Sequence, residues 1–150
     1  MAEVTYGLNT TITFEAAHRL YNVATYSDEC RENLHGHSYR VNVRVYRNKL
    51  NDAGMVMDFK LLKKILKENI EDVYDHCCIL KYDDPLVDPV RKNCKKVIIA
   101  EESPTAEWMA EKYYNLISRA LADVDDQLKV RSVEVQETER NIAIYEGDHS

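Results

Sequence analysis

The stretch ECRENLHGHSYRVNVRV, residues 29–45, contains the alternation that decides the fold. From His35 onward, ring-bearing and apolar side chains occupy the odd positions and most even positions are polar, which predicts a strand over residues 35–46 with one buried face. His37 lies two residues after His35, so both imidazoles project to the side that also carries Val41, Val43 and Val45. The strand therefore begins with two histidines directed at its buried face.

A second alternating run brings a third histidine to the same side. Ile12, Phe14 and Ala16 alternate with mostly polar residues, which predicts a strand over residues 8–17, and one further step of the alternation reaches His18. Three neutral imidazoles on an antiparallel pair of strands can hold zinc in an open tetrahedral site, with the fourth position left for water or substrate. The alternative is that HGH forms a turn with two solvated histidines, while His18 is a hydrogen-bonded core residue.

The pattern of the remaining chain predicts two helices. Asp58 is a candidate N-cap for the first helix, whose apolar stripe consists of Phe59, Leu62, Leu66, Ile70 and Val73. Ser103 is a candidate N-cap for the second helix, with Pro104 at the first helical position. This second helix is expected to bury Trp108, Met109, Tyr113, Leu116, Ile117 and Ala120.

Further strands are predicted over residues 97–100, 130–137 and 141–145, with a short extended piece at residues 55–57. The resulting order of elements predicts an α+β domain in which the helices pack on one face of an antiparallel sheet. The outer strands of such a sheet would be unprotected edges in a monomer, so we expect them to pair with neighbouring subunits.

The composition fits one domain over residues 1–150 that works in the cytoplasm. The formal net charge of −6 argues against a general binder of nucleic acid or anionic membranes, because both favour a basic protein face. No segment approaches the roughly 18 consecutive apolar residues of a membrane span, and residues 1–11 lack the layout of a signal peptide. The four cysteines show no CxxC spacing, so we expect reduced thiols.

Two further groups of residues can transfer protons. Cys30 lies five residues before His35, and its thiol could act as a base beside a substrate polarised by zinc; the alternative is an inert, small apolar residue. Asp75 and His76 are adjacent, and an aspartate bonded to an imidazole suits a general acid or base. Neighbouring residues pair in this way only in a tight turn, and the alternative is an ordinary surface turn.

A carboxylate near the end of the chain is a candidate ligand-binding group. Glu137 follows Val133 and Val135 in phase, so it is directed at the buried face, where a heterocycle with an amino group beside a ring N–H could supply two donors. The alternative is a strand-end glutamate that reaches water. Thr105 and Glu107 lie in the first turn of the second helix and are most simply capping and dipole residues.

Six ordered stretches resemble the family of 6-pyruvoyltetrahydropterin synthase and 6-carboxytetrahydropterin synthase. They are FEAAHRL, CRENLHGHSYRVNV, GMVMDF, YDH, SPTAEWMA and VEVQETERNIAIYEGD, and together they extend over essentially the whole chain. The resemblance implies the tunnelling fold (T-fold), in which each subunit contributes a four-stranded antiparallel sheet and two helices. Three subunits then close a twelve-stranded β-barrel, and two trimers form a homohexamer with active sites at the subunit junctions.

The resemblance also implies roles for the candidate residues. Zinc would be bound by His18, His35 and His37, and protons would be transferred by Cys30, Asp75 and His76. The substrate would be 7,8-dihydroneopterin triphosphate, with its pterin anchored by Glu137 and with Thr105 and Glu107 nearby. Zinc would bind the side-chain hydroxyls of the substrate and acidify the adjacent C–H and O–H bonds.

The spacing of Cys30 departs from the family pattern. Animal pyruvoyl enzymes place the cysteine six positions before HGH and typical bacterial carboxy-type enzymes four, whereas Cys30 is five before. Some members use a glutamate in this loop and cleave the side chain to 6-hydroxymethyl-dihydropterin for folate synthesis, so Glu29 and Glu32 are alternative bases.

The sequence LHGHSYRV and the longer insert before SPTAEW resemble the bacterial carboxy-type branch, which supplies the synthesis of queuosine and other 7-deazapurines. We therefore expect a lyase that forms 6-carboxy-5,6,7,8-tetrahydropterin, acetaldehyde and triphosphate. The alternatives are the pyruvoyl product and a zinc-containing pterin-binding module without activity.

Overall fold

Two long antiparallel strands form the centre of the fold. The computed structural model describes residues 4–25 and 27–147, and in it β1 (Tyr6–His18) and β2 (His35–Arg47) pair along their whole length. Their alternating side chains bury one face, as the sequence predicts. The register places His18 opposite His35 and Ala16 opposite His37.

The predicted four-stranded antiparallel sheet is present, and two short parallel strands extend it. β5 (Lys129–Thr138) pairs with β2, and β6 (Asn141–Glu146) pairs with β5. On the other side of β1, β3 (Cys77–Lys81) and β4 (Val97–Ala100) run parallel to its last residues, which gives the order β4-β3-β1-β2-β5-β6 among the described residues. β3 was not predicted, because CCIL is buried throughout and shows no alternation.

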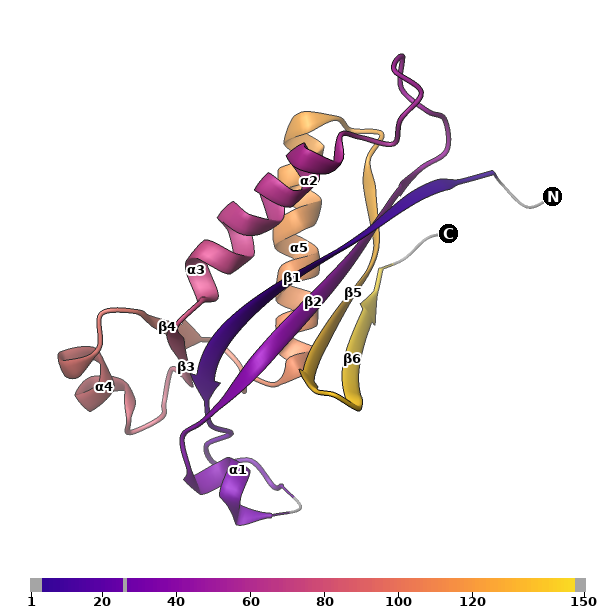
Figure 1. Ribbon diagram of the computed structural model, residues 1–150. Helices are drawn as coiled ribbons and strands as arrows, with labels where there is room; N and C mark the ends of the chain where they lie inside the picture. The colour runs from indigo at the N-terminus through magenta and orange to yellow at the C-terminus, as the bar shows by residue number, and fades with distance from the viewer. Residues whose placement is uncertain (1–3, 26, 148–150) are drawn as a thin grey trace.

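The two predicted helices cover one face of the sheet (Figure 1). The first consists of α2 (Phe59–Leu66), a π-helical turn η1 (Lys67–Glu71) and α3 (Asp72–Tyr74), and Asp58 caps it by accepting a hydrogen bond from Lys60 N. The second, α5 (Ala106–Val124), begins later than predicted. Its N-cap is Thr105, whose Oγ1 accepts from Trp108 N at 3.0 Å, so Ser103 as N-cap and Pro104 as first helical residue were wrong.

The π-helical turn changes which apolar residues of the first helix are buried. Leu62, Leu66 and Ile70 face the core as predicted, but Phe59 is 53% exposed and Val73 40% exposed. A π turn holds more residues than an α turn, so after Ile70 the next residue to face the core is Tyr74 instead of Val73. Phe59 starts the helix at the rim of the core, one turn before the stripe begins.

Three more details correct the predicted elements. Residues 55–57 form bends and no strand. In α5, Trp108, Leu116 and Ala120 are only partly buried against the core, whereas Ala110 and Leu121 are fully buried. Two short helices, α1 (Asp28–Glu32) and α4 (Val87–Asn93), lie outside the sheet in stretches that the sequence pattern left irregular. No helix in the described ranges is both long and apolar enough to span a membrane.

An aromatic cluster links the sheet to the helices. Phe14 of β1 stacks on Tyr39 of β2 with ring centroids 5.2 Å apart, and Tyr74 of α3 packs edge-on against Tyr113 of α5 at 4.9 Å. Phe14 also contacts both helical tyrosines. Tyr39 lies 5.4 Å from the ring of His37, so this rigid cluster supports the histidine end of the sheet.

Two leucines of α2 test this packing. Leu66 is fully buried, whereas Leu61 on the same helix is 37% exposed, and replacement by alanine removes the same atoms from both. Leu66→Ala should lower the free energy of unfolding by about 2–5 kcal/mol because it leaves a cavity, and Leu61→Ala by about 0.5 kcal/mol or less. Urea unfolding at one fixed protein concentration measures both values. Equal losses from the two variants would contradict the described burial.

Candidate functional site

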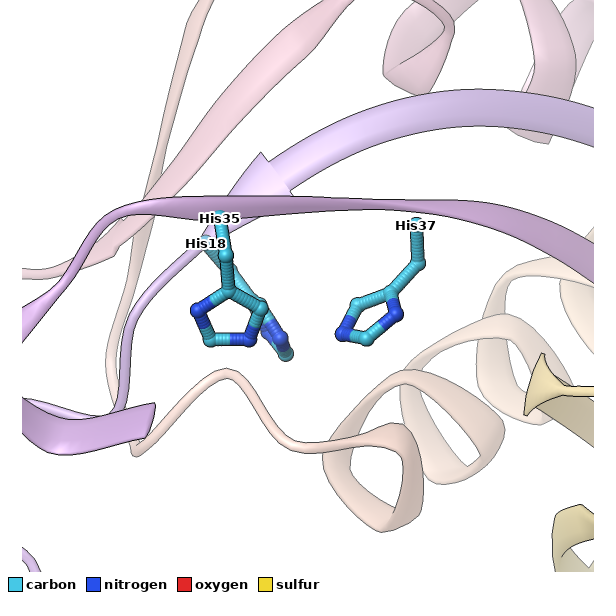
Figure 2. A group of neighbouring side chains, drawn as sticks. All are labelled: His18, His35 and His37. Carbon is cyan, nitrogen blue, oxygen red and sulfur yellow. The ribbon is translucent and has the colours of Figure 1, made fainter. Parts of the chain in front are cut away.

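Three histidine rings converge where β1 ends and β2 begins. Figure 2 shows the rings of His18, His35 and His37 projecting from the two neighbouring strands to the same side. One ring nitrogen from each lies within 4.8 Å of the others, and the ring centroids are 4.6–5.1 Å apart. The antiparallel register alone produces this arrangement, because it pairs His18 with His35 and the strand alternation adds His37.

Main-chain carbonyls fix the orientation of two of the rings. His18 Nδ1 donates to Pro104 O at 2.7 Å, and His35 Nδ1 donates to Asn33 O at 2.9 Å. A carbonyl can only accept, so in the neutral form both rings carry their proton on Nδ1 and present the Nε2 lone pair. Such support from the second ring nitrogen is typical of histidines that ligate metals.

The protonation states also suit a metal ligand. Burial lowers the pKa of His18 to about 4, although the hydrogen bond to Pro104 opposes this shift, and the charges of His35 and His37 lower it further. Burial and the neighbouring His35 lower the pKa of His37 as well. His18 and His37 are therefore neutral at pH 7. Three nitrogen donors within 4.8 Å of one another need only small ring movements to converge on a divalent ion with an open fourth position, as in catalytic zinc sites.

A cavity of about 330 Å³ lies beside the histidines. Its lining includes Thr105, Glu107 and Glu137, three residues that the sequence analysis selected, and also Arg140. Glu137 Oε1 lies 3.7 Å from His18 Nε2, so the cavity and the histidine cluster are adjacent. Burial raises the pKa of Glu137, the charge of Glu107 raises it further, and His35 opposes the shift.

One turn of the chain serves both the histidines and the cavity. Pro104 orients His18 through its carbonyl, and the next residue, Thr105, caps α5 and lines the cavity. The start of α5 therefore fixes the distance between the candidate metal site and the candidate substrate site. Thr105 was selected from the sequence, but the acceptors at Pro104 and Asn33 were not. Every residue has a main-chain carbonyl, so the residue type does not indicate which carbonyl will accept from a histidine.

Asp75 and His76 do form a pair, and the required tight turn is present. His76 Nδ1 lies 2.8 Å from Asp75 Oδ2, and His76 has a positive φ of 63°. Both residues are attached to β1, since Glu15 N donates to Asp75 Oδ1 at 2.9 Å and His76 N donates to Glu15 O at 2.6 Å. The hydrogen bond from Glu15, followed by the one from His76, lowers the pKa of Asp75.

The pair is not brought to the three histidines within one chain. The side chain of His76 is 78% exposed and lines a second cavity, of about 380 Å³, whose lining includes His37 of the cluster as well as Glu15, Ala17 and Ser38. The last three residues alternate with the histidine face of β1 and β2 and so project to the opposite side of the sheet. In the part of the chain that the structure describes, neither Asp75 nor His76 hydrogen-bonds to the histidine cluster.

Cys30 lies in α1, at the same end of the sheet as the histidines (Figure 1). Its thiol is partly buried, and its carbonyl accepts a hydrogen bond from Leu20 N at 2.8 Å. All four cysteines are free, as predicted. The glutamates considered as alternative bases, Glu29 and Glu32, belong to the same short helix.

Comparisons with known proteins agree with this picture. The family model described as 6-pyruvoyl tetrahydropterin synthase matches residues 7–148. Two proteins named 6-carboxy-5,6,7,8-tetrahydropterin synthase are similar: one from Rickettsia conorii is 34% identical over 85% of this chain and 90% of its own length. One from Aquifex aeolicus is 32% identical over 94% and 98% of the two chains.

Solved structures show the same fold. An uncharacterised protein from Wolinella succinogenes superposes with a TM-score of 0.82 at 24% identity, covering 97% of this chain and 99% of the other. A variant of Plasmodium vivax 6-pyruvoyltetrahydropterin synthase, in which a catalytic glutamate is replaced by alanine, gives a TM-score of 0.74 at 20% identity, with 96% and 98% covered. The predicted T-fold of the single chain is confirmed, and the chain belongs to the 6-pyruvoyl tetrahydropterin synthase family.

Proposed function

We propose that the protein is a zinc-dependent lyase that converts 7,8-dihydroneopterin triphosphate to 6-carboxy-5,6,7,8-tetrahydropterin, with release of acetaldehyde and triphosphate. The observation that carries this proposal is the histidine cluster next to the cavity of Thr105, Glu107 and Glu137. The names of the Rickettsia conorii and Aquifex aeolicus relatives support the choice of product. The enzyme would act in the cytoplasm, in the synthesis of queuosine and related 7-deazapurines.

Glu137 is the proposed anchor for the pterin ring. Its carboxylate is partly buried, and burial together with Glu107 disfavours its ionised form. A pterin presents an amino group beside a ring N–H, and two parallel hydrogen bonds from these donors would stabilise the ionised carboxylate. Glu137 would therefore select a heterocycle with this donor pair. Because Glu137 Oε1 lies 3.7 Å from His18 Nε2, the side chain of the bound pterin would lie near the histidines.

His18, His35 and His37 are the proposed zinc ligands, through nitrogens whose orientation the main chain already fixes in two of the three cases. Bound zinc would supply Lewis-acid chemistry that polarises the hydroxyls of the substrate side chain. The partial burial of the histidine cluster limits access of bulk water and strengthens the electrostatic interactions between residues and substrate.

Cys30, Asp75 and His76 are the proposed proton-transfer residues. Because His76 is largely exposed and neither member of the pair hydrogen-bonds to the histidine cluster of its own chain within the described residues, we propose that each site is completed by this pair from a neighbouring subunit. His76, oriented by Asp75, would accept and return a proton, and Cys30 would act beside the substrate side chain. The catalytic glutamate of the Plasmodium vivax protein keeps Glu29 and Glu32 as the alternatives to Cys30.

The free edges of the sheet support an assembly of identical subunits. Among the described residues, β3 pairs with residues 16–18 of β1 and leaves an open edge along the earlier part of that strand, and β6 is the last strand on the other side. Ile142 and Ile144 of β6 are exposed. Pairing the two edges between copies would remove both, and we propose a homohexamer built as a dimer of trimers around a closed barrel.

Removal of one histidine should abolish metal binding. Metal-free wild-type protein should take up one cobalt(II) ion per chain and develop the visible absorption of a tetrahedral site, while His37→Ala should bind at least about 100-fold more weakly. His76→Ala is the matched control, and it should retain the cobalt spectrum while it loses turnover. Cobalt uptake by His37→Ala equal to that of the wild type would remove the proposed metal site.

Product analysis tests the proposed reaction directly. Zinc-loaded protein incubated with 7,8-dihydroneopterin triphosphate should yield 6-carboxytetrahydropterin and free acetaldehyde, as measured by mass spectrometry. Cys30→Ala should lower kcat by about 100-fold or more because general acid–base catalysis contributes on that scale, and Glu32→Ala should leave most activity. A pyruvoyl or hydroxymethyl product would replace the proposed reaction, and unchanged substrate would indicate a pterin-binding module.

The assembly can be measured without any substrate. Sedimentation equilibrium should give a mass six times that of the 17.5 kDa chain, with a trimer as the smaller species on dilution. A monomer at micromolar concentration would contradict the proposal that sites form between subunits, because Asp75 and His76 would then have no histidine cluster to face.

A further inference from the structure

A buried ion pair connects two loops at the histidine end of the sheet. The side chain of Asp84 has no exposed surface, and that of Arg19, the residue after His18, is only 13% exposed. Arg19 donates to both oxygens of Asp84, from Nε to Oδ2 at 2.7 Å and from Nη2 to Oδ1. This two-pronged geometry is the strongest that an arginine and a carboxylate can form, and it fixes the guanidinium plane.

Asp84 is itself held rigidly in the turn between β3 and α4. Its Oδ1 also accepts from Leu86 N at 2.8 Å, its own N donates to Lys81 O at 3.0 Å, and its carbonyl accepts from Val87 N at 3.0 Å. The carboxylate therefore cannot follow Arg19 if the arginine moves. Asp84 therefore holds the guanidinium group of Arg19 in one position.

The other side of Arg19 faces the helix that carries Cys30. Arg19 Nη1 donates to the carbonyl of Glu32 at 3.3 Å, and the next residue, Leu20, donates its N–H to the carbonyl of Cys30 at 2.8 Å. α1 has five residues and none of them is buried, so neither packing nor helix cooperativity can hold it in place. These two hydrogen bonds join α1 to the two residues that follow β1.

We propose that Arg19 and Asp84 form a positioning pair that fixes α1, and with it the thiol of Cys30, relative to the three histidines. The catalytic part of this inference rests on the proposed function. The pair touches neither substrate nor metal in this role, because Asp84 acts through Arg19 and Arg19 acts through the main chain of α1. The same contacts explain why an arginine follows His18 and why the turn after β3 carries a buried carboxylate.

A second buried arginine provides a matched control. At the opposite end of β2, Arg47 Nη1 donates to Asp125 Oδ2 at 2.9 Å, and the Arg47 side chain is 9% exposed. Asp125→Asn removes a charge from an Arg–Asp pair whose arginine is buried like Arg19 but whose carboxylate is 32% exposed, far from α1 along the strand. A purely structural role for the Arg19–Asp84 pair predicts that Asp84→Asn, like Asp125→Asn, changes stability without a specific effect on Cys30 or on kcat.

The test compares both variants in a Cys94→Ser background, because Cys94 is exposed whereas Cys77 and Cys78 are buried. Both variants should lower the melting temperature. Only Asp84→Asn should speed the alkylation of Cys30 by iodoacetamide, by about 10-fold, because α1 detaches.

Only Asp84→Asn should also lower kcat, by about 10- to 100-fold, with KM and the cobalt spectrum unchanged. Arg19→Lys keeps the positive charge but cannot donate to both oxygens of Asp84 in the same plane. It should also speed the alkylation of Cys30 and lower kcat, and this variant provides the test if Asp84→Asn does not fold.

The outcomes separate this inference from the proposed function. If the wild type does not turn over the pterin substrate, the proposed function fails, and the alkylation rates still decide whether the pair fixes α1. If the wild type is active but Asp84→Asn and Arg19→Lys leave the alkylation of Cys30 and kcat no more affected than Asp125→Asn does, the inference is overturned.

Discussion

The antiparallel register of β1 and β2 is the constraint on which the site depends. It places His18 opposite His35 and leaves His37 one alternation further along the same face. A slip of one residue would move all buried side chains of one strand to the other face, so the apolar pattern that stabilises the sheet also selects the one register in which the three histidines meet. The core residues Phe14, Tyr39 and Val41 therefore enforce the geometry of a site that they do not form.

Two further connections tie the surrounding residues to this pair of strands. The turn at Pro104 and Thr105 joins the histidines to the cavity of Glu137, and the hydrogen bonds with the main chain of Glu15 hold Asp75 and His76. The first connection lies on the helix side of the sheet and the second at the edge of β1, with His76 exposed on the opposite side. One face thus carries the candidate metal and substrate groups, while His76 of the candidate proton-transfer pair is exposed, as the proposed assembly of subunits requires.

The parts predicted from the sequence are those set by short-range periodicity. The alternation of β1 and β2 predicted their shared buried face and selected His18, His35 and His37 as candidate ligands, and the phase of Val133 and Val135 predicted the direction of Glu137. The parts missed depend on distant partners. CCIL gave no periodic signal for β3, the π turn displaced Val73 from the stripe, and nothing near Arg19 in the sequence points to Asp84, 65 residues away.

The acceptors that orient His18 and His35 are carbonyl groups of the main chain, at Pro104 and Asn33. Every amino acid has such a carbonyl, so the orientation of the rings does not depend on which side chain stands at either position, provided that the backbone path is kept. A substitution at residue 33 that keeps the backbone path would therefore keep the acceptor of His35. A search for invariant side chains would not detect the carbonyls that orient these two imidazoles as candidate metal ligands.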